Sequence, residues 1–110
     1  MTTARFWENG SRYEISITGH AGYNTNGPDI VCASCSALAY TLLNEILTVD
    51  AEGGVHGVST EINDADGVFK LSFYTNPSAR DRVHNSVNLI LSGFCLLANR
   101  YPDFVIVACA

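Results

Sequence analysis

The segment from Gly19 to Ser36 reads GHAGYNTNGPDIVCASCS and contains a histidine, His20, and a cysteine, Cys32, that could do chemistry together. A thiolate is a nucleophile, and a nearby imidazole can take its proton and later protonate a leaving amine. Cys32 lies in about the first turn of an expected helix, where unpaired backbone N–H groups and the helix dipole favour the thiolate form. The same N–H groups could receive the negative charge on a carbonyl oxygen that Cys32 attacks.

Two other residues of the segment could support this pair. Asp29 could orient His20 as a third member of the site, or it could cap the helix that follows. Its charge near Cys32 would oppose the thiolate, so we expect Asp29 to have a partner. Ser36 lies one helical turn beyond Cys32 on the same face, where it could bond within the site or allow close packing.

The loop from Ala21 to Gly27 is rich in glycine and asparagine and has no charged side chain. Such a loop has little to hold it in place, so we expect it to be mobile and to order over a bound substrate. The residues expected to contact that substrate are Gly22, Tyr23, Asn24 and Gly27.

Cys35 forms a C-x-x-C pair with Cys32, which opens two alternatives. A zinc site would need two further ligands, and only His20 and His56 are candidates. A dithiol redox site would resemble the helix-start arrangement of thioredoxin, but Cys35 falls on the core side of its helix, which favours packing. A buried, inert thiol is the other interpretation for each cysteine, and we expect Cys95 and Cys109 in the core. We expect no metal and no cofactor.

The rest of the chain predicts the elements that position this segment. Strand patterns occur at 1–8, 12–18, 55–62, 68–74 and 104–109, the last wholly apolar and typical of a buried strand. Asn9-Gly10 predicts a hairpin turn, and the second strand ends just before His20. Helices are expected from Pro28-Asp29 to about Val49 and from Asn76-Pro77 to about Arg100. This ββαββαβ order predicts one α+β domain over residues 1–110, a mixed or antiparallel sheet packed with two helices.

The first helix carries a wide apolar arc. The core stripe is Val31, Cys35, Leu38, Leu42 and Ile46, and a second stripe, Cys32, Ser36, Ala39, Leu43 and Leu47, lies beside it. One sheet face needs less apolar surface than this, which leaves room for a dimer contact.

Composition excludes several kinds of partner. The net charge of −5 argues against binding to a nucleic-acid backbone and suits a basic partner. The longest apolar run, Phe104 to Ala110, is too short to cross a membrane, and the first residues do not resemble a leader. We therefore expect a cytoplasmic protein with reduced thiols.

Three short motifs resemble the signature of the Prp family of ribosomal-processing cysteine proteases. They are Gly19-His20-Ala21, the run GPDIVCA at 27–33, and Ser36-Ala37-Leu38. The resemblance implies a cysteine endopeptidase with His20 and Cys32 as its catalytic pair and Asp29 and Ser36 in support. The sequence departs from the family pattern at Pro28 and at Cys35, and neither departure removes a catalytic residue.

The resemblance also implies a substrate and an assembly. Family members remove an N-terminal extension from the twenty-seventh protein of the large ribosomal subunit, cutting after an aromatic residue and before a small one, and they form homodimers. Cleavage would then pass through a thioester on Cys32. A non-catalytic binding module for a ribosomal or phage protein is the alternative from another class, and the intact His20 and Cys32 pair speaks against it.

Overall fold

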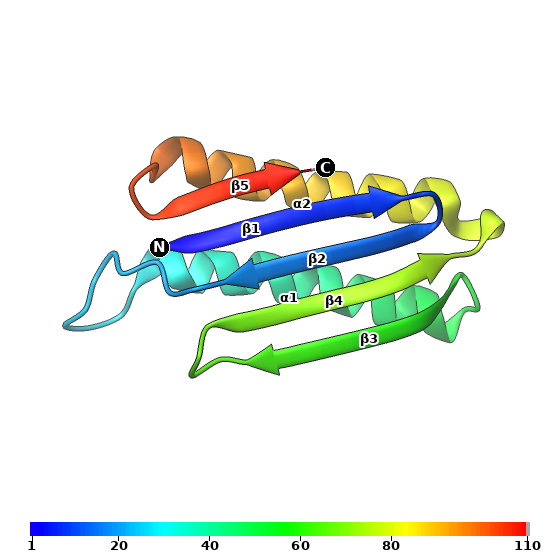
Figure 1. The fold of residues 1–110 in the computed structure, drawn as a ribbon, viewed down its shortest axis with the longest axis horizontal. Coiled ribbons are helices and arrows are strands. Elements are labelled where there is room, and N and C mark those ends of the chain that lie inside the picture. Colours follow the sequence, from blue (N-terminus) through cyan, green and yellow to red (C-terminus); the bar gives the residue numbers. More distant parts are fainter. Residues whose placement is uncertain (110) are drawn as a thin grey trace.

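A computed structural model describes residues 1–109 of the chain. Its elements are β1 (Thr2–Asn9), β2 (Arg12–Thr18), α1 (Ile30–Ala51), β3 (Val55–Asn63), β4 (Val68–Thr75), a short 3-10 turn (Pro77–Ala79), α2 (Arg80–Arg100) and β5 (Val105–Cys109). The strands form one five-stranded sheet in the order β3-β4-β2-β1-β5, as Figure 1 shows. The expected ββαββαβ order and α+β class are confirmed.

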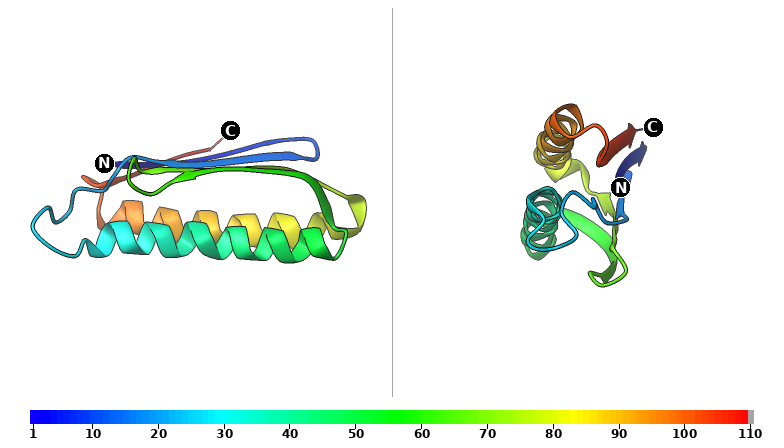
Figure 2. Two further views of the ribbon diagram at one scale, coloured as in Figure 1. Left: turned by 90° about the horizontal axis from the view of Figure 1, so that it is seen from below. Right: turned by 90° about the vertical axis from the view of Figure 1, so that its left-hand side faces the viewer.

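The sheet is mixed. β1 pairs antiparallel with β2, β2 with β4, and β4 with β3, whereas β5 runs parallel to β1. A parallel neighbour requires a crossover connection, and α2 supplies it between β4 and β5. Both helices lie side by side on one face of the sheet and leave the other face open (Figure 2).

The core lies between the two helices and the covered face. Alternate residues of β2 point into it, so that Tyr13, Ile15 and Ile17 are all buried. Tyr13 stacks on Phe73 of β4 with ring centroids 5.3 Å apart. On α1 the buried residues are Val31, Cys35, Ala39, Leu42, Ile46 and Val49, which fits the expected core stripe except that Leu38 is only partly buried.

Two predictions about the C-terminal strand and the cysteines were wrong. β5 is the outermost strand beside β1, and of its residues only Val105 is buried. Cys95 and Cys109 are both exposed. An apolar strand is buried on both sides only where both faces of its sheet are covered, and here the helices cover one face of the sheet.

The second helix begins later than the expected start at Asn76-Pro77. Asn76 makes no capping hydrogen bond, and its side chain bonds instead to His56 and to the carbonyl of Gly53. The chain passes through the 3-10 turn before α2 begins at Arg80.

Among the described residues, α1 alone has the length and apolar composition that a membrane-spanning helix would also have. Here its buried stripe packs against the sheet as the core helix of the fold.

Candidate active site

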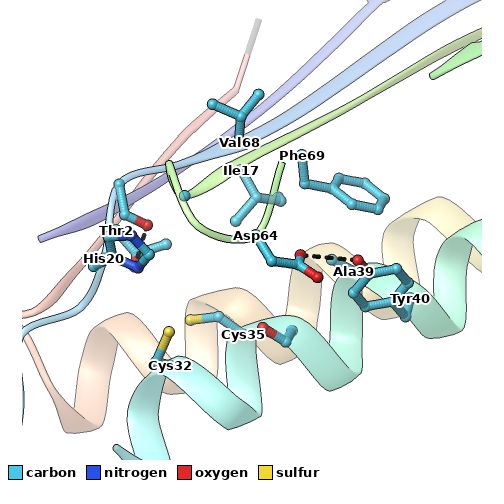
Figure 3. Close-up of a pocket in the computed structure, with 13 residues that line it drawn as sticks. Thr2, Ile17, His20, Cys32, Cys35, Ala39, Tyr40, Asp64, Val68 and Phe69 are labelled. Atoms are coloured by element: carbon cyan, nitrogen blue, oxygen red, sulfur yellow. Dashed lines mark hydrogen bonds between the residues drawn. The ribbon is translucent and has the colours of Figure 1, made fainter. Parts of the chain in front are cut away.

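A cavity of about 270 Å³ opens between α1 and one end of the sheet, and both His20 and Cys32 line it. Figure 3 shows the sulfur of Cys32 pointing from the first turns of α1 into the space below His20. The lining residues are Thr2, Ile17, Gly19, His20, Cys32, Cys35, Ser36, Ala39, Tyr40, Asp64, Gly67, Val68 and Phe69. The strand end and the helix start that the sequence predicts therefore meet at one cavity.

His20 is held by the turn between β3 and β4. Its Nε2 atom lies 3.0 Å from the carbonyl oxygen of Ala65. A carbonyl only accepts, so Nε2 carries the proton in this contact, and Nδ1 of the neutral ring is left as the acceptor. Gly67 allows the turn to come this close to His20, because a Cβ atom at position 67 would lie 3.2 Å from Nε2 and 3.0 Å from the backbone of Gly19.

Cys32 is the third residue of α1 and is partly buried. Asp29 caps the helix, and its Oδ1 atom accepts from the backbone N–H groups of Val31 and Cys32 at 3.0 and 2.9 Å. The N–H of Ala33 donates to the Asp29 carbonyl. The expectation that these helix-start N–H groups would receive an oxyanion is therefore wrong for this arrangement, because they already have acceptors.

Asp29 is the helix cap rather than the orienting partner of His20, whose ring bonds to Ala65. Desolvation tends to raise the pKa of the Asp29 carboxyl, but hydrogen bonds from backbone N–H groups, that of Cys32 foremost, outweigh it and lower the pKa below its ordinary value. Asp29 is thus ionised at neutral pH. Its expected partner is this set of N–H groups, which offsets its charge beside the Cys32 thiol.

The loop before α1 is fixed more firmly than its composition indicates. The Oδ2 atom of Asp29 accepts from the N–H of Tyr23 at 2.9 Å and of Asn24 at 3.4 Å. The Tyr23 ring packs edge-on against Tyr101 and Phe104, with centroids 5.5 and 5.3 Å away. The expectation that little holds the loop in place was wrong.

The expected substrate-loop residues lie beside the cavity rather than in it. Gly22, Tyr23, Asn24 and Gly27 are all exposed, and the cavity lining does not include them. The loop extends beyond the end of the sheet between β2 and α1, as Figure 1 shows.

The structure disfavours both C-x-x-C alternatives. Cys35 is 3% exposed and packs in the core, and burial raises its pKa to about 11, so it remains a neutral thiol at pH 7. His56 pairs with Tyr74, which pairs with Arg12 at the start of β2, so it lies at the opposite end of the sheet from His20 and bonds to Asn76. In the described part of the chain, no three His, Cys, Asp or Glu residues are grouped as a metal site would require.

Two cavity residues, Tyr40 and Asp64, were missed by the sequence analysis. Tyr40 could have been found, since it continues the helical spacing of Cys32 and Ser36 by one further turn. Its hydroxyl donates to Oδ1 of Asp64 at 2.9 Å, and its ring packs edge-on against Phe69. Asp64 comes from the turn after β3, and no local pattern indicates that it lines the cavity.

Solved structures of other proteins share this fold. The ribosomal processing protease Prp from Staphylococcus aureus, in complex with a covalently linked product peptide, superposes with a TM-score of 0.77 at 19% identity over 100% of both chains. The same enzyme with a substrate peptide gives 0.72 at 18% identity, again over 100% of both chains. SMU.848 from Streptococcus mutans gives 0.73 at 26% identity, covering 99% of this chain and 93% of its own. A search of curated proteins found no significant match.

The chain thus has the fold of the Staphylococcus aureus enzyme, and in it a cysteine at a helix start and a histidine line one cavity. The family model of the cysteine protease Prp matches residues 1–106, and the chain belongs to that family.

Proposed function

We propose that His20 and Cys32 are the catalytic pair and that the protein cleaves a peptide bond through a thioester. The observation that carries this assignment is that both side chains line the same cavity, one from each side. Nδ1 of His20 takes the Sγ proton of Cys32, and the thiolate attacks the scissile carbonyl carbon. The C–N bond then breaks, and the leaving amine takes the proton from His20. Water hydrolyses the thioester and restores the thiol.

Ala65 and Ser36 support this cycle in different ways. The Ala65 carbonyl, hydrogen-bonded to Nε2, stabilises the positive charge that forms on the His20 ring during proton transfer. Ser36 presents an exposed hydroxyl to the cavity one turn beyond Cys32. We assign this hydroxyl to the backbone of the bound peptide.

The proposed substrate is the precursor of a ribosomal protein, the twenty-seventh of the large subunit, that carries an N-terminal extension. The relative from Staphylococcus aureus is a ribosomal processing protease. Ribosomal proteins are basic, and the −5 net charge of this chain favours encounter with them. Apolar walls at Ile17, Val68 and Phe69 suit the aromatic residue expected before the cleavage site.

Replacing Cys32 with alanine tests the assignment. We expect Cys32→Ala to lose cleavage of an extended precursor peptide, followed by mass spectrometry, while the peptide still binds. The matched control is Cys95→Ala, because Cys95 is a free thiol exposed on α2 and outside the cavity. Retained cleavage by Cys32→Ala, or equal loss in both variants, would refute Cys32 as the nucleophile.

We further propose that the protein acts as a homodimer in the cytoplasm. Large apolar side chains remain exposed on the helices, with Leu89 at 72%, Leu96 at 57% and Leu47 at 49%. Exposed apolar groups of this size suit contact with a second copy. The free cysteines suit a reducing compartment.

A further inference from the structure

The β3–β4 turn, which also holds His20 through Ala65, places a negative charge on the wall of the cavity. Asp64 lines this wall, and its carboxylate points into the cavity above α1 (Figure 3). Oδ1 accepts the hydroxyl of Tyr40 at 2.9 Å. Among residues 1–109, no lysine, arginine or histidine forms an ion pair with Asp64, and its Oδ2 atom accepts no hydrogen bond.

The cavity runs along one face of α1 from the proposed nucleophile to this charge. Cys32, Ser36 and Tyr40 follow one another at single-turn spacing, so Tyr40 lies about 12 Å from Cys32 along the helix axis. An extended peptide advances about 3.3 Å per residue, so a long side chain placed about two or three residues from the scissile bond spans that distance.

We propose that Asp64 binds a lysine or arginine side chain of the substrate, about two or three residues from the scissile bond. This inference rests on the proposed function and adds a second determinant of specificity to the same site. Lysine and arginine both carry their charge at the end of a long apolar stem, so either side chain can reach this carboxylate.

The surroundings of Asp64 fit such a side chain. The rings of Tyr40 and Phe69 form the adjacent wall, against which the methylene groups of a lysine or arginine can pack. The hydrogen bond to Asp64 raises the pKa of Tyr40, so its hydroxyl remains a donor at neutral pH and fixes one carboxylate oxygen. The other oxygen is left for the incoming cation.

Paired peptides test the proposal. A single lysine is moved through the three positions on either side of the scissile bond of the precursor peptide, and each version is compared with one carrying norleucine there. For wild-type protein we expect kcat/KM to favour lysine about fivefold at one position, the size typical of a partly exposed ion pair. In Asp64→Asn the lysine-to-norleucine ratio should fall to about one.

The matched control is Asp66→Asn, which removes an equal charge from the same turn but from outside the cavity lining. It should keep the wild-type ratio, and Tyr40→Phe, which keeps the carboxylate, should still favour lysine. The wild-type ratio should also shrink as salt is added. Equal ratios in wild type and Asp64→Asn, or equal loss in Asp66→Asn, overturn the inference while cleavage itself continues. If no peptide is cut at all, the proposed function fails as well, so the two failures are distinguishable.

Discussion

At the scale of single residues, Asp29 connects the start of α1 to the loop that precedes it. One carboxylate oxygen accepts from the N–H groups of Val31 and Cys32, and the other accepts from those of Tyr23 and Asn24. The position of Cys32 and the course of the loop therefore depend on one side chain. Asp29 therefore contacts the proposed nucleophile through the Cys32 backbone N–H, whereas the His20 ring bonds to Ala65.

Two replacements separate these roles. Asp29→Ala removes the cap and should lower the free energy of unfolding by about 0.5–2 kcal/mol in urea denaturation. Asp29→Asn keeps an oxygen for the cap but turns an amide N–H₂ toward the loop, so it should cost less stability yet speed hydrogen exchange at Asn24 and lower kcat/KM.

The lowered pKa of Asp29 also sets a pH dependence. A carboxyl with a lower pKa in the folded state contributes stability above its unfolded pKa, and this is lost as pH falls through the folded value. Stability curves of wild type and Asp29→Asn should therefore converge in acid. A constant difference between the curves, or unchanged exchange at Asn24, would contradict this account.

At the scale of elements, the β3–β4 turn controls the histidine side of the cavity. It supplies the Ala65 carbonyl that bonds to His20 and the Asp64 side chain that lines the cavity. At Gly67 it also passes close to the backbone of Gly19 and to the His20 ring. Gly67 has φ of +65°, a conformation that other residues adopt only at a cost. The turn is therefore part of the site although it contributes no proposed catalytic residue.

Gly67→Ala should reduce both stability and cleavage. Alanine is strained at this positive φ, and its methyl group would press on the backbone of Gly19. We expect the free energy of unfolding to fall by about 1–3 kcal/mol and kcat to fall because the His20 ring is displaced. Gly10→Ala is the matched control, because Gly10 has φ of +60° but nothing within 4 Å of its Cβ position. It should lose stability and keep kcat. Equal kcat values in the two variants would show that the turn does not position His20.

The local parts of the site could be predicted from sequence, and the distant parts could not. His20 at a strand end, Cys32 at a helix start and Cys35 in the core follow from turn chemistry and helical spacing over a few residues. Asp64 and Ala65 reach the cavity only because β2 pairs with β4, a pairing of strands that are not neighbours in the chain.

The burial of individual cysteines depends on the whole arrangement in the same way. Cys95 and Cys109 look like core residues by type, but their exposure depends on which face the helices cover and which strand is outermost.

At the scale of the whole molecule, one uncovered sheet face and exposed leucines on the helices leave surface for assembly. Leu89 and Leu96 are seven residues apart on α2 and therefore share one side of it. We expect sedimentation velocity to give twice the 11.9 kDa mass of one chain. Leu89→Glu should reduce it to a single chain, because a charge on this surface opposes burial. A wild-type protein that sediments as one chain at all concentrations would contradict the dimer.

The position of β1 has a consequence for biosynthesis. β1 is made long before β5 but pairs with it in the sheet, where β1 lies between β2 and β5. During translation one edge of β1 stays without its partner until residues 105–109 leave the ribosome. Thr2, which lines the cavity, donates its backbone N–H to Phe104, just before β5. The nascent chain therefore cannot complete this wall of its cavity before residues 104–109 have left the ribosome.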